Sequence, residues 1–177
     1  MRIKISILLA ILLMLLSACT TNSVKEIQRS EIENEPFKLI IESEKSVYTS
    51  GEPLNIKAKL IYQGEENSTE ISHGGSPISF STTNITKDYQ FGSAMNVPLN
   101  TTILKKSDPY IETYSFTGSP YIPDYDGEPY SEDEYNLMVN EQFPAGQYKI
   151  TATTDFSQNK NMDLSLKLET SVIITIK

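Results

Sequence analysis

The sequence predicts an all-β protein whose strands form a two-sheet antiparallel sandwich, and three observations lead to this prediction. Apolar and polar residues alternate over several segments that follow Pro36, with the period of a half-buried strand. Clusters of Gly, Pro, Asn and Asp, which favour turns, separate these segments. Only one short segment has the signals of a helix. Several short strands with frequent turns and almost no helix are typical of a sandwich.

The strongest strand patterns lie towards the two ends of the predicted domain. Residues 54–62 alternate in polarity between two turn sequences, Ser50-Gly51-Glu52-Pro53 and Gln63-Gly64-Glu65. Residues 37–41 and 148–153 alternate in the same way. Weaker candidates are residues 70–73, 78–81, 89–93, 101–104 and 111–116. We expect the buried core to include Leu54, Ile56, Ala58, Leu60, Tyr148, Ile150, Ile174 and Ile176.

Between residues 164 and 176 every second residue is apolar, but this alternation is interrupted at Glu169-Thr170-Ser171. A single strand of this length would extend roughly 40 Å, which is long for a small sandwich. We therefore expect a bend or bulge at the lapse. The one predicted helix begins at Ser131-Glu132-Asp133-Glu134, which has the form of a capping box, and places Tyr135 and Met138 on one face.

The N-terminus has the pattern of an export signal. Two basic residues, Arg2 and Lys4, precede an apolar run at 5–16 that is too short to span a membrane as a helix but has the length of a signal-peptide core. The run ends at Leu16-Ser17-Ala18-Cys19, which resembles the lipobox of bacterial lipoproteins. The resemblance implies that residues 1–18 are removed and that Cys19 carries a diacylglyceryl group. Two acyl chains give stable anchoring, whereas one gives marginal binding.

The resemblance also implies where the protein lies: at the cell membrane, lipid-anchored on its outer, extracytoplasmic face. The polar residues 20–35 would then form a tether of about 20–25 Å. We thus expect a signal peptide at 1–18, the lipidated Cys19 and tether at 19–36, and one domain at 37–177.

Two motifs in the domain resemble those of bacterial extracellular immunoglobulin-like domains. Tyr48-Thr49-Ser50-Gly51-Glu52-Pro53 resembles their entry into the second strand, and Pro144-Ala145-Gly146-Gln147-Tyr148 resembles the lead into their penultimate strand. Among such families the chain is most similar to the BsuPI-like domains, named for a bacterial intracellular proteinase inhibitor. The resemblance covers residues 37–62 and 143–176 and implies an immunoglobulin-like β-sandwich. It carries over no inhibitory residue, because no functional motif matches.

Composition excludes several classes of function. The formal net charge is -8, so nucleic acid is not expected as a partner. The chain has one Cys and one His, which excludes an internal disulfide and a Cys/His zinc cage. We expect no cofactor and no metal. The acidic stretch around Asp124, Asp126 and Glu128 is interpreted as a solvated loop because its spacing does not match an EF-hand, and calcium binding is the alternative.

Two further segments were weighed as sites. His73-Gly74-Gly75 resembles an oxyanion-hole segment of esterases, but no serine has the nucleophile-elbow context, so we interpret it as a turn. Residues 106–131 form a long segment rich in tyrosine. Its rings either contact a partner or hold the segment onto its own sheet. The candidates for partner contact are Tyr110, Tyr114, Tyr121, Tyr125 and Tyr130.

These observations favour a non-enzymatic protein: a lipid-anchored binding module of the cell envelope that contacts an envelope or secreted protein. The alternative, based on the BsuPI-like resemblance, is a regulator similar to a proteinase inhibitor that presents residues 106–131 to a protease. A hydrolase that uses Asp124 or Glu128 is a third class, against which stands the absence of apolar residues that would raise one carboxylate pKa.

The lipobox gives the first prediction. Replacing Cys19→Ser removes the thiol that accepts the lipid, so the protein should move from the detergent phase to the aqueous phase in phase partitioning, and intact mass should show no lipid. A variant that remained bound to the membrane would show that the anchor is assigned wrongly.

Overall fold

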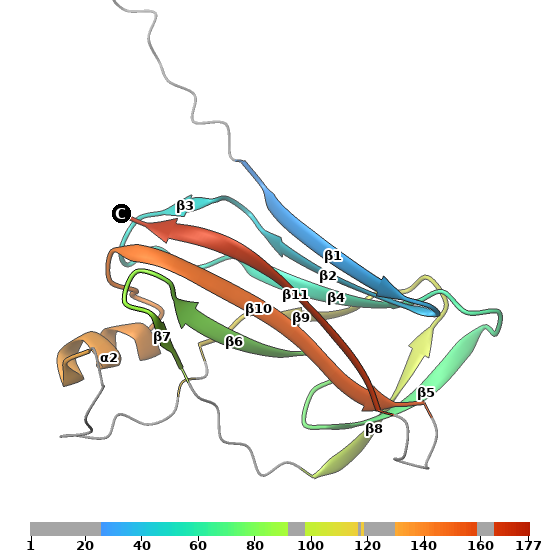
Figure 1. The fold of residues 1–177 in the computed structure, drawn as a ribbon. Helices are drawn as coiled ribbons and strands as arrows, with labels where there is room; N and C mark the ends of the chain where they lie inside the picture. Colours follow the sequence, from blue (N-terminus) through green and yellow to red (C-terminus); the bar gives the residue numbers. More distant parts are fainter. Residues whose placement is uncertain (1–25, 92–97, 117, 119–129, 159–164) are drawn as a thin grey trace, which may run out of the picture.

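The computed structural model describes residues 26–91, 98–116, 118, 130–158 and 165–177, and shows there two β-sheets packed as a sandwich with one helix at its side (Figure 1). The predicted all-β class is confirmed. The strand pairs are antiparallel except the pair of β3 with β11 and an isolated bridge at Lys106. Cys19 lies outside the described residues, and the described part contains no helix long and apolar enough to cross a membrane.

The smaller sheet has four strands in the order β1-β2-β4-β9. Their bounds are β1 Gln28–Asn34, β2 Phe37–Ser43, β4 Ile56–Tyr62 and β9 Tyr110–Thr113. The larger sheet has the order β3-β11-β10-β5-β8, with β6 paired to β10 and β7 paired to β6. Its strands are β3 Val47–Tyr48, β5 Ser68–Gly74, β6 Ser79–Asn84, β7 Tyr89–Gln90, β8 Leu99–Lys105, β10 Gly146–Ser157 and β11 Ser165–Ile176.

The space between the sheets is filled by the alternate apolar residues that the sequence pattern singles out. On β4, Ile56, Ala58 and Leu60 are fully buried, while Lys57 on the opposite face is exposed. All eight residues expected in the core are buried. Burial of apolar surface at about 25 cal/mol per Å² makes this layer the main source of stability.

Strands β10 and β11 pair over twelve consecutive residues without a bulge, so the expected irregularity at residues 169–171 is wrong. The apolar alternation is interrupted at residues 169–171 for another reason. Glu169 and Ser171 point away from the core, whereas Thr170 is buried and its Oγ1 donates a hydrogen bond of 2.7 Å to Ser30 Oγ on β1. A satisfied hydroxyl can occupy a core position at low cost, so the strand continues through the lapse.

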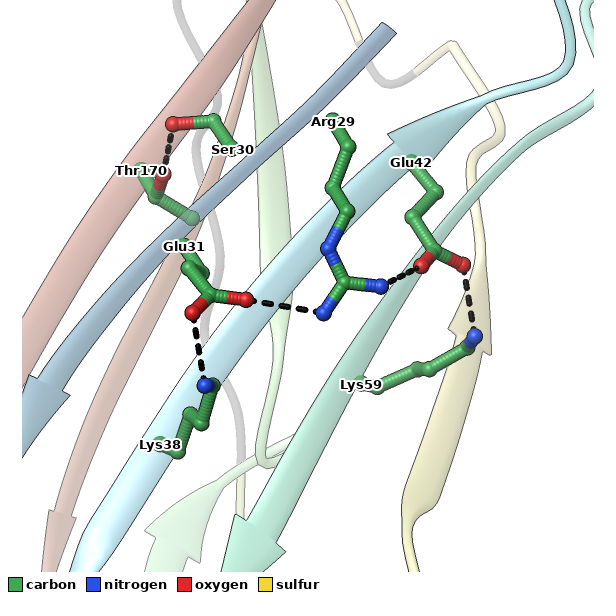
Figure 2. A network of polar contacts seen from close by, with 7 residues as sticks. All are labelled: Arg29, Ser30, Glu31, Lys38, Glu42, Lys59 and Thr170. Atoms are coloured by element: carbon green, nitrogen blue, oxygen red, sulfur yellow. Dashed lines mark hydrogen bonds and ion pairs between the residues drawn. The ribbon is translucent and has the colours of Figure 1, made fainter. Parts of the chain in front are cut away.

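Strand β1 corrects the predicted tether, because the sheet begins at Gln28 rather than at residue 37. None of its seven side chains is buried, so it has no apolar period by which the sequence could reveal it. Its support comes from the backbone ladder with β2, the bond between Ser30 and Thr170, and a chain of charges on the outer face (Figure 2). The strand thus depends on polar contacts, not on the core.

The chain of charges crosses three strands (Figure 2). Arg29 donates to Glu31 at 2.8 Å and also to Glu42; Lys38 donates to Glu31 and Lys59 to Glu42. The hydrogen bond from Lys38 lowers the pKa of Glu31, and that from Lys59 lowers the pKa of Glu42. Such solvent-facing pairs contribute little each, and here they act as a group that joins β1 to β2 and β4.

The single described helix, α2 (Glu132–Val139), has the predicted capping box at Ser131 and Glu134. Tyr135 and Met138 are buried, which confirms the predicted apolar face. The helix lies at the β6–β7 end of the sandwich, whereas β5 and β8 lie at the opposite end (Figure 1).

The core gives the second prediction. Replacing Ile56→Asp places an unpaired carboxylate at a fully buried position. The free energy needed to bury this charge is more than a domain readily tolerates, because the stability of an ordinary domain is only about 5–15 kcal/mol. The variant should lack a cooperative thermal transition by circular dichroism. Lys57→Asp introduces the same side chain on the exposed face and should retain the fold. Similar melting curves for the two variants would contradict the assigned core.

A candidate ligand-binding pocket

Strands β5 and β6 lie along the same edge of β10, one after the other, and a large bulge separates them. Ser72 and His73 of β5 pair with Ser157 and Phe156, and β6 resumes where Ser79 pairs with Thr153. Residues 74–78 therefore lie opposite only residues 154–155. Such insertions re-aim side chains and interrupt pairing.

The bulge follows from the sequence Gly74-Gly75-Ser76-Pro77. Gly75 has a φ of 64°, a conformation that favours glycine. Pro77 has no N–H and cannot continue the ladder with β10. Ile78 then turns inward and is 1% exposed, which fixes the start of β6.

Polar contacts hold the bulge to both sheets. Ser76 Oγ donates to Glu112 Oε2 at 2.7 Å, and the hydroxyl of Tyr110 donates to the same oxygen at 3.1 Å. Both partners belong to β9 of the smaller sheet. On the other side, Asn100 of β8 donates to the carbonyl of Gly75 at 3.2 Å. The bulge is thus a fixed part of the fold.

A pocket of about 350 Å³ opens at this bulge, within the range of small-molecule sites. Most of its polar groups are hydroxyls, and Asp155 is the one carboxylate among the lining residues. The described residues that line it include no Lys or Arg. The lining hydroxyls belong to Ser72, Ser76, Ser79, Thr153, Ser157 and Ser165, and apolar surface comes from Pro77, Leu99 and Phe156.

His73, at the inner side of the pocket, is 4% exposed. Burial lowers its pKa, and the nearby Gly75 backbone partly opposes this shift, so the imidazole is neutral near pH 7. Its Nε2 lies 2.8 Å from Thr102 Oγ1, while Nδ1 has no well-formed hydrogen bond with the described residues. The described part contains no bond between this ring and a serine. The described residues thus form no esterase-like serine–histidine pair at this ring.

The three candidate tyrosines within the described residues, Tyr110, Tyr114 and Tyr130, do not form one exposed surface. Tyr114 and Tyr130 are 3% and 4% exposed, so both rings belong to the core. The hydroxyl of Tyr114 lies 2.8 Å from Thr82 Oγ1, and burial raises the pKa of this phenol. Asn84 donates to the hydroxyl of Tyr130, and Lys87 Nζ lies 4.0 Å from the centre of the same ring.

For Tyr114 and Tyr130 the structure supports the alternative in which the rings hold the segment onto its own sheet. Tyr110 is half-buried and is used in the contact with Glu112. Tyr121 and Tyr125 lie outside the described residues, as do Asp124, Asp126 and Glu128. The described residues include no group of three or more Asp, Glu, His or Cys side chains that could hold a metal.

Sequence reasoning singled out residues 73–75 as a turn but did not find the pocket. Its other walls come mainly from residues 153–157 and from Ser165, about eighty positions later, and depend on the register of β5 and β6 against β10. The usable signal was the sequence Gly-Gly-Ser-Pro between two strand candidates.

His73 gives the third prediction. Because folding favours the neutral imidazole, stability should fall as the pH drops below about 6.5, the ordinary pKa of histidine. Protonation of Glu31 and Glu42, whose pKa values are lowered in the folded protein, also reduces its stability, but only below about pH 4.5. In His73→Gln the melting temperature should change less between pH 7 and pH 5.5 than in the wild type. An equal decrease in both proteins would show that His73 does not carry this pH dependence.

A comparison with protein-family models gives no match, and neither does a comparison with curated proteins. Function therefore has to be argued from the residues themselves.

Proposed function

We propose that this protein is a lipid-anchored, non-catalytic binding module on the outer face of the cell membrane, and that the pocket at the β5–β6 bulge is its contact site. The lipobox at Cys19 and the apolar run before it support the location. The single observation that carries the binding role is a bulge that is fixed to both sheets and opens a pocket.

The chemistry of the pocket favours binding over catalysis. Catalysis by a nucleophile needs a base within hydrogen-bond reach. In the described part of the chain, His73 contacts Thr102, and the carboxylate of Asp155 accepts a 2.9 Å bond from Ser165. Thr102 is not among the residues that line the pocket, and the pair of Ser165 with Asp155 contains no imidazole base.

No observation favours the inhibitor alternative. It required residues 106–131 to form a protruding loop, but residues 110–113 form strand β9 in the smaller sheet and Tyr114 is buried. The remainder of that segment falls mostly at residues 119–129, outside the described part.

The fourth prediction tests the contact site in cells. A photo-crosslinking residue at Leu99, which lines the pocket and is 58% exposed, should capture an envelope component. The matched control is Ile173, 50% exposed on the outer side of β11, eight residues or about 26 Å along the strand from Ser165. It should not capture that component.

Two outcomes would count against the proposal. Capture of the same set of proteins from both positions would show contact that does not depend on the pocket. If no component were captured at Leu99, the pocket would not be the contact site.

A further inference from the structure

Two serines that line the pocket have no hydrogen-bond partner for their hydroxyls among the described residues. Ser72 and Ser157 are a cross-strand pair between β5 and β10, and they are 7% and 5% exposed. Among the described residues, neither side chain makes a hydrogen bond, although both line the pocket. Although the two residues are largely buried, their hydroxyl oxygens stay accessible from the pocket, because His73 Nδ1 is the one buried and unpaired side-chain polar atom of the described part. This pair is therefore available to a group that enters the pocket.

The character of these groups restricts the ligand. A hydroxyl both donates and accepts, so a lining rich in Ser and Thr complements a ligand whose own groups do both. Carbohydrate hydroxyls have this property. An anion would instead need cationic donors, and none of the described residues that line the pocket is a Lys or Arg.

Asp155 adds one acceptor of higher strength. Its Oδ1 accepts from Ser165 Oγ at 2.9 Å, which fixes the carboxylate and leaves its other oxygen for a ligand donor. A single carboxylate is too few for a divalent cation, which prefers six or more oxygen ligands with several charges among them. A hydroxyl donor on the ligand satisfies the carboxylate without requiring a charge.

The remaining walls are apolar. Pro77 and Leu99 line the pocket, and Leu99 is among the most exposed apolar residues of the described part. A sugar ring has C–H groups on its faces and hydroxyls around its rim, so it matches a pocket that has both kinds of wall.

We infer that the pocket at the β5–β6 bulge binds a neutral, polyhydroxylated ligand with the chemistry of a sugar ring in a glycan. This inference rests on the proposed function, which assigns ligand contact to the same pocket. The carboxylate of Asp155 and the paired hydroxyls of Ser72 and Ser157 hold the ligand's hydroxyl groups.

The test uses the full-length lipoprotein in a detergent without a sugar headgroup. Saturation-transfer NMR measures binding of cellobiose and of chitobiose, with tetramethylammonium and inorganic phosphate as charged probes. At least one disaccharide should bind, and neither charged probe should. Asp155→Asn keeps the side-chain shape but weakens the acceptor, so the Kd should rise about tenfold.

The control is Glu169→Gln, which removes an exposed carboxylate from the outer face of β11 and should leave the Kd unchanged. Ser157→Ala should also weaken binding, and circular dichroism verifies that each variant is folded. Binding of phosphate or tetramethylammonium in place of the disaccharides would overturn the inference. So would disaccharide binding that neither Asp155→Asn nor Ser157→Ala weakens.

The failure of this inference can be distinguished from failure of the proposed function. If Leu99 captures an envelope component in cells but no disaccharide binds, the ligand class is wrong and the binding module stands. If Leu99 captures nothing and no disaccharide binds, both proposals are wrong.

Discussion

The ladder between β10 and β11 is the interaction on which the other elements depend. Twelve residue pairs join the two strands without interruption. On one side β11 meets β3 and, through Thr170, β1; on the other side β10 supports both β5 and β6. The inner faces supply Tyr148, Ile150 and Ile174 to the core. The bulge at residues 74–78 takes its shape from the register of β5 and β6 on β10, so it depends on this ladder.

The bulge shows a local departure from the rules that the rest of the chain follows. Elsewhere apolar residues face the core and polar residues face water, but at the bulge two serines are buried and a ladder is broken by glycine and proline. Departures of this kind concentrate where a protein binds or reacts, because the fold is otherwise stabilised by satisfying its polar groups. The contacts of Ser76 and Asn100 with their neighbours offset part of the lost pairing.

Elements with a strong local signal could be predicted from the sequence, and those held by distant polar contacts could not. Alternating polarity identified β4 and β10, and the capping box identified α2, because these signals lie within a few residues. Strand β1 has no buried side chain and so resembled a tether. The expected bend in β11 failed because Thr170 has a partner on β1, about 140 positions earlier. The pocket could not be predicted for the same reason, since the local sequence pattern does not encode the register of the strands.

The exposed position of β1 has a mechanical consequence if the proposed lipid anchor holds the chain at its N-terminus. Tension from that side enters the domain at Gln28, which pairs with Ser43 at the end of the hairpin farthest from the Glu35–Pro36 turn. A pull directed away from the sheet therefore opens the ladder one pair at a time instead of loading all pairs together. Release of the seven residues extends the chain by about 23 Å. Since none of the side chains of β1 is buried, the strand is a reserve of length whose release removes the partner of Thr170 but no apolar side chain of the core.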